Sequence, residues 1–477
     1  MPKRAREIDL PDLDLPADLP LSRRLEEGLR SAILSGQLQP GARLPSSRAL
    51  AARLGVSRTT VLTACDRLLA EGYLVGRVGS GTYVAGDLPA PGRRQARPVP
   101  ALSRRGALIA ATPVSAPRSG GAPRPFAPGV PALDRFPGEL WSALGAARLR
   151  EHGAAYPDPA GHPELRAAVA THLAMSRGVR CAPEQVLIVG GSQQAIDLTA
   201  RVLCDPGDRV LVEDPGYLGA RGALAAAGAR LIPAPVDDEG ITLMEGPARL
   251  VYVTPSHQYP LGVTMSLHRR LALLDWAARR GAFILEDDYD SEYRYSGKPL
   301  AALQGLDPDG RVIYAGTFSK VLFPGLRLGY LVVPRPLIQA FTQALALSGR
   351  GAPVLEQAIL ADFMAAGHFA RHVRRTRLLY GERQAHLLAA ARHHLAGLLE
   401  IEPASSGMHL VGWLRQGWDD RAAAARAAAR GVDVVPLSAL ALRPLHRPGL
   451  VLGYTGYDAA CLEDGVKRLA AALAESG

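Results

Sequence analysis

The first hundred residues alternate amphipathic stretches with short turns. Between residues 21 and 38 apolar side chains recur at helical spacing, which predicts a helix with one buried face: Leu21, Leu25, Leu29, Ile33 and Leu34. The segment PGARLPS interrupts this pattern, SSRALAARLG restores it behind two capping serines, and VSRTT opens a third helix that ends near Glu71. Two short helices around a glycine turn predict a helix-turn-helix, and YLVGRVGSGTYV predicts a two-stranded wing.

From residue 126 onward, short apolar runs alternate with longer stretches rich in Ala, Leu and Arg. The runs QVLIVGG, RVLVEDP, LVYVTP, AFILEDD and RVIYAGT predict strands, and the stretches between them predict helices. This rhythm is typical of βαβ units on a mostly parallel sheet. Helices dominate after about residue 345, and residues 400–477 mix both patterns. We therefore expect the α/β class, with a large sheet domain and a smaller α/β domain.

These patterns predict four segments. They are an N-terminal extension (1–19), a winged helix-turn-helix domain (20–86), a flexible linker rich in Pro, Gly, Ala and Arg (87–125), and an α/β domain (126–477). Within the last segment we expect the large part at about 155–345 and the small part at about 126–154 and 346–477.

The net charge of +10 is concentrated at one end of the chain. Residues 1–105 hold 17 Lys and Arg against 10 Asp and Glu, which favours a polyanion as the partner of this region. No apolar run reaches the ~18 residues that span a bilayer. The charged first residues lack the apolar stretch of a signal peptide, and the four cysteines are scattered without a C-x-x-C pair. We expect a cytoplasmic protein with reduced thiols and no membrane partner.

The start of the third predicted helix carries candidate DNA contacts. Ser57, Arg58, Thr59 and Thr60 place hydroxyls, a guanidinium and backbone N–H groups where they can reach phosphates or the major groove. A helical bundle with a basic, solvated face is the alternative.

The string G-x-L-x-P-G-x-R-L-P-S-x-R-x-L-A-x-x-L-G-V-S-R-x-T-V, followed by L-x-x-E-G-Y and G-S-G-T-Y-V, resembles the winged helix-turn-helix of the GntR family. The resemblance covers nearly all of residues 20–86. It implies DNA contacts at Arg48, Ser57, Arg58, Thr59, Thr60 and Gly79.

Lys320 is the main candidate for covalent chemistry. It is one of only four lysines, and a lysine amine forms an imine whereas a guanidinium does not. In RVIYAGTFSKVLFPGLRLGY it lies close to Thr317, Ser319 and Arg327, whose two hydroxyls and guanidinium can bind one phosphate. This combination predicts a phosphate-bearing aldehyde cofactor joined to Lys320 as a Schiff base. A surface lysine in a loop is the alternative.

A run of carboxylates ends the predicted strand in AFILEDDYDSEYRY. Glu286, Asp287, Asp288 and Asp290, with Tyr289 among them, would lie at the carboxyl edge of the sheet, where open α/β sheets bind ligands. A pyridoxal ring needs a carboxylate at its pyridinium nitrogen and benefits from a donor to its phenolic oxygen. A Mg²⁺ or Ca²⁺ site is the alternative, but the glycine and closing glutamate of a calcium loop are absent, so we expect no metal.

Two further turns follow predicted strands. Gly190-Gly191-Ser192-Gln193 precedes a helix, as in many phosphate sites, and Pro-Gly-Tyr217 offers an aromatic ring.

In their order, GSQQAIDL, EDPGY, TPSHQYPLG, EDDYDSEYRY and GTFSKVLFPGLRLGY resemble the fold type I aminotransferases, and together with the N-terminal module they resemble the MocR/GabR subfamily of GntR regulators. The resemblance implies pyridoxal 5'-phosphate bound covalently to Lys320. It implies that Asp287 pairs with the pyridine nitrogen, Tyr289 bonds the phenolic oxygen, Tyr217 stacks on the ring and His257 contacts it. The phosphate ligands it implies are Ser192, Gln193, Thr317, Ser319 and Arg327.

One position departs from the aminotransferase pattern. Where those enzymes place an arginine for the substrate carboxylate, this chain has Val451 in GLVLGYTGY. Arg443 and Arg447 are the candidate substitutes, and without one, transamination of ordinary α-amino acids becomes doubtful.

We therefore expect a transcription regulator that binds operator DNA and senses a small amine or amino acid through an external aldimine formed at the cofactor of Lys320. A working aminotransferase with a DNA-binding appendage is the alternative from the enzyme class, and pyridoxal phosphate itself is the alternative effector. The resemblance implies a homodimer, with RNA polymerase as a further candidate partner.

Overall fold

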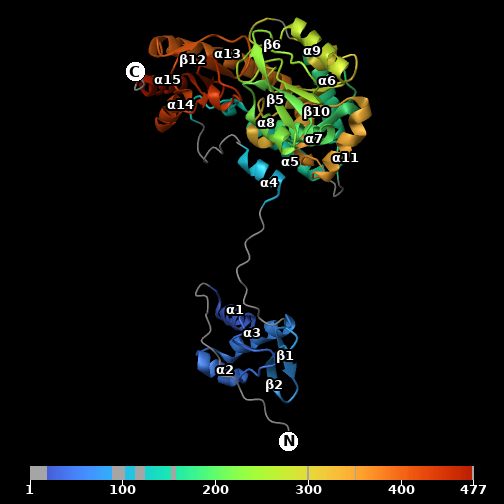
Figure 1. The fold of residues 1–477 in the computed structure, drawn as a ribbon, viewed down its shortest axis with the longest axis vertical. Helices are drawn as coiled ribbons and strands as arrows, with labels where there is room; N and C mark the ends of the chain where they lie inside the picture. The colour runs from blue at the N-terminus through green and yellow to red at the C-terminus, as the bar shows by residue number, and fades with distance from the viewer. Residues whose placement is uncertain are drawn as a thin grey trace. The chain divides into compact units, whose positions relative to one another are not determined.

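The computed structural model describes residues 19–88, 102–112, 124–151, 157–297, 300–349 and 351–474 (Figure 1). The chain divides into two compact units, residues 1–101 and 102–477. Each is described by itself below. Within the described residues no helix is long and apolar enough to cross a membrane.

The first unit is a winged helix-turn-helix. Its elements are α1 (Leu21–Leu34), α2 (Ser47–Leu54), α3 (Arg58–Ala70), β1 (Leu74–Arg77) and β2 (Gly81–Val84). Ser46 caps α2 by accepting a hydrogen bond from the Ala49 N–H at 3.2 Å, and Gly55, at φ +64°, ends it. Leu25, Leu29 and Ile33 of the predicted stripe pack on α3 and the wing in one small core, whereas Leu21 and Leu34, at the two ends of α1, are exposed, so the stripe is shorter than predicted. The predicted three helices and wing are confirmed.

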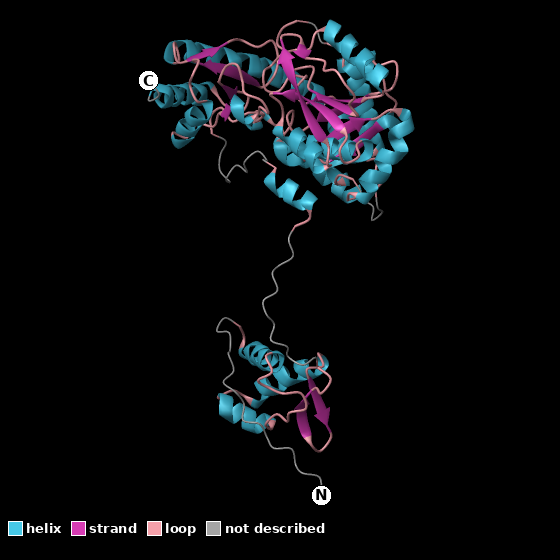
Figure 2. Cartoon of the chain, in the orientation of Figure 1, coloured by secondary structure: helices cyan, strands magenta, loops and turns pink. Residues whose placement is uncertain are grey.

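An eight-stranded sheet organises the second unit, in the order β3-β10-β9-β8-β7-β4-β5-β6 (Figure 2). The strands β9, β8, β7, β4 and β5 run parallel, as predicted, while β10 lies antiparallel between β9 and β3. The bounds are β3 (Val186–Val189), β4 (Arg209–Asp214), β5 (Arg230–Asp237), β6 (Gly240–Ile241), β7 (Leu250–Val253), β8 (Phe283–Asp288), β9 (Val312–Thr317) and β10 (Gly329–Val332).

Helices cover both faces of this sheet. Alternate strand residues enter two different cores: Val210 and Val212 pack with α7 and α8, whereas Leu211 packs with α9. This is why the strand sequences are apolar throughout. The helices are α5 (Gly138–Glu151), α6 (Pro163–Arg177), α7 (Ser192–Leu203), α8 (Leu218–Ala226), α9 (Leu267–Arg280), α10 (Leu303–Leu306), α11 (Ile338–Leu347) and α12 (Val354–Ala365).

A second, antiparallel sheet lies in the C-terminal part, in the order β11-β12-β14-β13. Its elements are α13 (His368–His394), β11 (Leu399–Ile401), β12 (His409–Leu414), α14 (Asp420–Ala429), β13 (Val435–Pro436), β14 (Gly449–Gly453) and α15 (Ala459–Ala474). The predicted smaller α/β domain is this sheet with its helices.

The stretch predicted as a linker contains one helix, α4 (Arg104–Ala111). Ser103 caps it by accepting from the Gly106 N–H at 2.9 Å, and Arg105 Nε donates to the Ala226 carbonyl oxygen at 2.8 Å, which holds α4 against the end of α8. The helix is only eight residues long and lies in a stretch rich in Pro and Gly, so its pattern was too short to predict a helix from the sequence. The remaining linker residues (89–101 and 113–123), and 1–18 of the predicted extension, lie outside the described residues.

Candidate functional site

The N-terminus of α3 presents a row of polar side chains. Ser57 Oγ accepts a hydrogen bond from the Thr60 N–H at 3.0 Å, which caps the helix. Arg58 and Thr59 are exposed, and Arg58 Nε donates to Ser47 Oγ of α2 at 3.2 Å. Four of the predicted DNA contacts therefore lie at one helix end, tied to the preceding helix.

The other two predicted DNA contacts lie on neighbouring elements. Arg48 is exposed in the first turn of α2. Gly79 is exposed in the turn of the wing at φ +72°, a conformation that favours glycine. The Arg77 guanidinium lies 4.7 Å from the centre of the Tyr83 ring, so the wing also carries a positive charge that the sequence did not single out.

A buried carboxylate joins α1 to α3. Glu26 accepts hydrogen bonds from Arg23 at 2.6 Å, from Arg30 at 2.7 Å and from Arg67 of α3 at 3.1 Å. Burial alone would raise the pKa of Glu26, but these arginines hold it below its ordinary value. The network fixes α3 against the rest of the unit.

In the second unit, Lys320 follows the carboxyl end of β9. Its Nζ donates to the Gly129 carbonyl oxygen at 3.1 Å. Gly129 has φ +69°, and a Cβ there would lie 2.5 Å from that Nζ, so a glycine makes room for the amine. Thr317 ends β9 and accepts from the Ser319 N–H at 3.2 Å, so three of the predicted cofactor ligands share one turn.

The remaining predicted phosphate ligands lie close to this turn because β10 pairs with both β9 and β3. Arg327 precedes β10, and a Cβ on Gly191 would lie 4.0 Å from its guanidinium carbon. Gly191 in turn precedes Ser192 and Gln193, which open α7 with their backbone N–H groups. A glycine turn, a helix N-terminus and a guanidinium form a cradle suited to a phosphate.

Asp287, the last residue but one of β8, is buried and has one oxygen unused. Tyr252 Oη donates to its Oδ2 at 2.7 Å, while Oδ1 is buried and has no hydrogen-bond partner among the described residues. Burial raises the pKa of Asp287 to about 6, against the lowering effect of Tyr252. A carboxylate with one buried, unsatisfied oxygen fits the N–H of a pyridinium ring.

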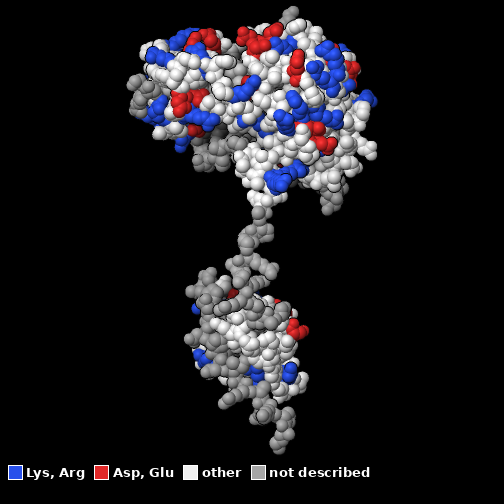
Figure 3. Space-filling view, in the orientation of Figure 1, with Lys and Arg blue, Asp and Glu red and all other residues white. Residues whose placement is uncertain are grey.

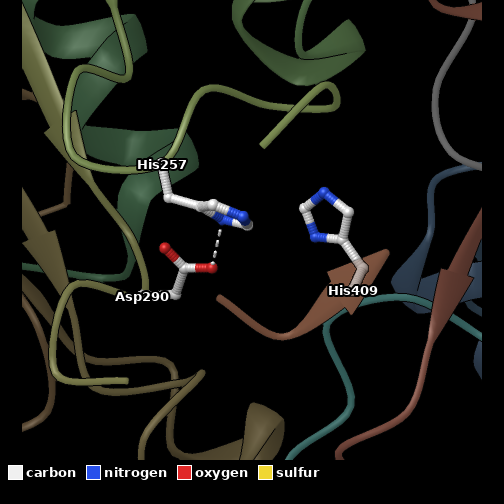
Figure 4. Close-up of side chains that lie close together, drawn as sticks. All are labelled: His257, Asp290 and His409. Carbon is white, nitrogen blue, oxygen red and sulfur yellow. Dashed lines mark hydrogen bonds and ion pairs between the residues drawn. The ribbon is translucent and has the colours of Figure 1, made fainter. Parts of the chain in front are cut away.

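His257 and Asp290 form a buried pair (Figure 4), and Tyr289 lies next to it. His257 Nδ1 lies 2.9 Å from Asp290 Oδ2 and 3.0 Å from Tyr289 Oη, and Tyr289 Oη donates to the His257 carbonyl oxygen at 3.0 Å. The sequence predicted a ring contact for His257. Because its Nδ1 is engaged by Asp290 and Tyr289, the structure links it to the site through Tyr289.

His409, from β12, completes this cluster, and the sequence did not indicate it. Its Nε2 donates to the Pro260 carbonyl oxygen at 3.0 Å, and burial, followed by the charges of His257 and Lys320, lowers its pKa to about 3. The ligand atoms of His257, Asp290 and His409 lie within 4.8 Å of one another, as in a metal site. We interpret the cluster as a polar network that orients Tyr289, because Tyr289 Oη lies 3.0 Å from His257 Nδ1 and donates to the His257 carbonyl oxygen.

Tyr259 is a second residue that the sequence did not single out. Its ring centre lies 6.0 Å from that of Tyr217 and 6.1 Å from that of Tyr289, in edge-to-face contacts. The Tyr259–Pro260 peptide bond is cis. Tyr217 precedes α8 and is half-buried. These aromatic contacts bring the predicted ring ligands Tyr217 and Tyr289 to one place.

Val451 is fully buried in β14, where it pairs with Val411 of β12 and Val435 of β13. The two arginines that could substitute for a carboxylate-binding arginine here, Arg443 and Arg447, both pair with acidic residues. Arg443 Nε pairs with Asp214 Oδ2 at 3.1 Å, just before the turn that carries Tyr217, and Arg447 pairs with Glu400 at 2.5 Å.

Comparison with known proteins adds to this geometry. Residues 138–445 match the family model "Aminotransferase class I and II", and residues 21–84 match "Bacterial regulatory proteins, gntR family". The chain is 45% identical to "Probable rhizopine catabolism regulatory protein MocR" of Rhizobium meliloti, over 97% of this chain and 95% of that protein. It is 33% identical to "HTH-type pyridoxine biosynthesis transcriptional regulator PdxR" of Corynebacterium glutamicum, over 93% of this chain and 96% of that protein.

The fold is also that of solved aminotransferases. One is LysN, the α-aminoadipate aminotransferase of Thermus thermophilus, complexed with N-(5'-phosphopyridoxyl)-L-leucine. The two proteins are 33% identical, and their match covers 73% of this chain and 92% of LysN with a TM-score of 0.68. Pyridoxal phosphate is the cofactor of this domain, and the unsatisfied oxygen of Asp287, the glycine cradle and the Lys320 amine fit it.

Full-length similarity and both family models agree with the fold and the residues around Lys320. The chain belongs to the MocR-type regulators of the GntR family, in which a winged helix-turn-helix and an aminotransferase-like, pyridoxal phosphate-binding domain share one polypeptide.

Proposed function

We propose that this protein regulates transcription by binding operator DNA with its first unit and a small amino compound with its second. The observation that carries this proposal is the presence, on one chain, of an exposed α3 N-terminus and of a Lys320 amine whose charge acts on Asp287, a buried carboxylate with one oxygen unsatisfied among the described residues. The first feature fits DNA and the second fits a cofactor that reacts with amines.

In the first unit, we assign base and phosphate contacts to the start of α3 and supporting contacts to α2 and the wing. Arg58 offers a bidentate donor and Ser57 and Thr59 offer hydroxyls, all held by the cap of α3. The assigned residues are Arg48, Ser57, Arg58, Thr59, Thr60 and Gly79. The exposure of all of them except the half-buried Thr60, and their place on α2, α3 and the wing, support this assignment.

In the second unit, we assign to each predicted residue one task toward pyridoxal phosphate, which supplies an aldehyde that primary amines attack reversibly. Lys320 presents its amine, Asp287 accepts from the pyridine nitrogen, Tyr289 donates to the phenolic oxygen, and Tyr217 covers the ring. His257 holds Tyr289. The residues that bind the phosphate are Ser192, Gln193, Thr317, Ser319 and Arg327.

Ligand binding alters DNA affinity only as far as the ligand prefers one conformation of the protein. We further propose that the protein acts as a homodimer, whose two helix-turn-helix units would contact two half-sites of an operator. RNA polymerase is a further partner at a promoter. Such a regulator acts in the cytoplasm, where the chromosome lies.

An aminotransferase with a DNA-binding appendage is the second candidate. The similarity to LysN favours it, while the apolar Val451 argues against turnover of ordinary amino acids. Pyridoxal phosphate itself is an alternative effector, since one relative is named as a regulator of pyridoxine biosynthesis.

The experiment is a DNA-binding titration. The full chain selects a DNA sequence from a random pool, and affinity for that sequence is then measured without cofactor, with pyridoxal phosphate, and with cofactor plus candidate amines. We expect specific DNA binding that the cofactor or an amine changes at least about fivefold. Absence of specific DNA binding, or steady conversion of an amino donor and a keto acid with DNA affinity unchanged, would contradict the proposal.

A further inference from the structure

One side of the site around Lys320 is apolar. Leu218, Tyr259 and Leu261 are partly exposed, and they pack on the buried Val451, Leu437 and Leu440. We name these six residues the apolar wall. It is drawn from four separate segments of the chain, including α8, the loop before α9 and β14.

The apolar wall adjoins the cofactor residues directly. Leu218 follows Tyr217 in the chain, and the Tyr259 ring contacts those of Tyr217, Tyr289 and His409. A ligand joined to the cofactor near Lys320 therefore meets this wall at its partly exposed residues, Leu218, Tyr259 and Leu261.

Cationic side chains near the wall already have partners. Arg443 pairs with Asp214, and Arg221 Nη1 donates to the Leu440 carbonyl oxygen at 3.1 Å. Arg447 lies with Glu400, and its guanidinium lies 5.7 Å from the centre of the Trp413 ring. The His409 ring contacts that of Tyr259, and burial lowers the pKa of His409 to about 3. Within the described residues, the wall carries no cationic side chain that could form a bidentate pair with a carboxylate of the ligand.

We propose that the ligand of this protein is a primary amine whose skeleton is uncharged and apolar where it meets the wall, and that it carries no carboxylate there. This rests on the proposed function, because the wall selects only what the cofactor site admits. Desolvating a carboxylate against the partly exposed Leu218 and Leu261 without a counter-charge is unfavourable, whereas a methyl or methylene group gains from the same burial.

A matched ligand pair tests the proposal. 3-Methylbutylamine and L-leucine share an apolar chain and differ in one carboxylate. Each is titrated into the full chain loaded with pyridoxal phosphate, and the change in cofactor absorbance and in Tm is recorded, with free pyridoxal phosphate as the reference for intrinsic reactivity. Relative to that reference, we expect the amine to bind at least about tenfold more tightly than leucine. Equal or tighter binding of leucine would overturn the proposal.

Variants sharpen the test. Val451→Arg places a cation in the wall and is expected to reverse the preference toward leucine, while Val451→Leu keeps the wall apolar and is expected to keep the preference for the amine. Because an arginine at a buried position can unfold the unit, Leu261→Arg, at a partly exposed position, is the second variant. If a folded, cofactor-loaded arginine variant shows no gain for leucine, the wall does not select the ligand.

The outcomes separate this inference from the proposed function. Cofactor loading and the response of DNA affinity belong to the proposed function. The ranking of 3-methylbutylamine and L-leucine tests the wall alone. If the protein loads cofactor but binds leucine more tightly than the amine, the proposed function stands and the inference about the wall is wrong.

Discussion

At the residue scale, Asp287 takes its chemistry from its contacts. Tyr252 donates a hydrogen bond to one of its oxygens, and the other has no hydrogen-bond partner among the described residues. Burial, with smaller contributions from the neighbouring Asp288 and Asp290, raises its pKa to about 6. A protonated ring nitrogen would donate a hydrogen bond to the unpartnered oxygen and would place a positive charge next to the carboxylate.

Asp287→Asn tests this role. The amide keeps the shape of the side chain and removes its charge, so we expect the dissociation constant of pyridoxal phosphate to rise about tenfold or more. The measurement is a titration of cofactor absorbance. Asp309→Asn, the same change at an exposed loop position, is the control, and equal effects of the two variants would contradict the assignment of Asp287.

Arg58→Ala tests the reading head. Loss of its guanidinium at the N-terminus of α3 is expected to weaken binding to the selected DNA by about 1–3 kcal/mol without changing cofactor binding. Fluorescence anisotropy measures the DNA affinity. Arg279→Ala removes the same charge from an exposed position on α9 in the other unit. If both variants bind DNA like the wild type, α3 is not the recognition helix.

At the element scale, local signals were sufficient for the first unit and insufficient for the site around Lys320. Serine caps and the leucine stripe lie within a few residues of the helices they define, so α1, α2 and α3 could be predicted from the sequence. The contact of Lys320 with Gly129 spans 191 residues, and no local pattern encodes it. His409 joins the site only because β12 returns to it from the second sheet.

The same limit explains which features were missed. β10 enters the sheet antiparallel between β3 and β9, and this pairing, which brings Arg327 to Gly191, follows from topology rather than from periodicity. The motif order, in contrast, located Lys320, Asp287 and Tyr289 because it reflects family resemblance. The helix α4 escaped prediction because eight residues give too few turns for a clear pattern.

Gly129→Ala tests the packing of the segment that meets Lys320. A Cβ at this position lies 2.5 Å from Lys320 Nζ and must displace the amine, so we expect weaker cofactor uptake and a loss of about 1 kcal/mol of stability from the positive φ. Gly281→Ala has nearly the same φ, +66°, with open space around it. We expect a similar loss of stability there with normal cofactor uptake, and normal uptake in both variants would contradict this account.

At the scale of the whole molecule, the charge distribution agrees with a division of tasks. Basic residues are in excess in the first part of the chain, whereas basic and acidic side chains are interspersed on the face of the second unit seen in Figure 3. The second unit also buries carboxyl groups at the ends of β4 and β8. Burial raises the pKa values of Glu213 and Glu286 to about 7.

These buried groups make stability depend on pH. Between about pH 4.5 and 7 the folded protein holds a proton on Glu213 that the unfolded chain has released, so the free energy of unfolding falls as pH rises through this window. Glu213→Gln removes this contribution. We therefore expect the difference in free energy of unfolding between the variant and the wild type to shift by about 3 kcal/mol in favour of the variant from pH 4.5 to pH 8. Urea unfolding of the cofactor-free protein at both pH values measures it.

The exposed Glu139→Gln is the control for this prediction, and it is expected to show the pH dependence of the wild type. A Glu213→Gln variant that also follows the wild-type pH dependence would show that Glu213 titrates at its ordinary pKa.

The most direct test of the central claim, that an aminotransferase-like site built on Lys320 belongs to this DNA-binding chain, is to map the cofactor. The full chain is incubated with pyridoxal phosphate, reduced with borohydride and digested, and the modified peptide is identified by mass spectrometry. With only four lysines in the chain, the assignment is unambiguous. The account predicts one modified residue, Lys320, and its loss in Lys320→Ala. A modification at another lysine, or none at all, would contradict it.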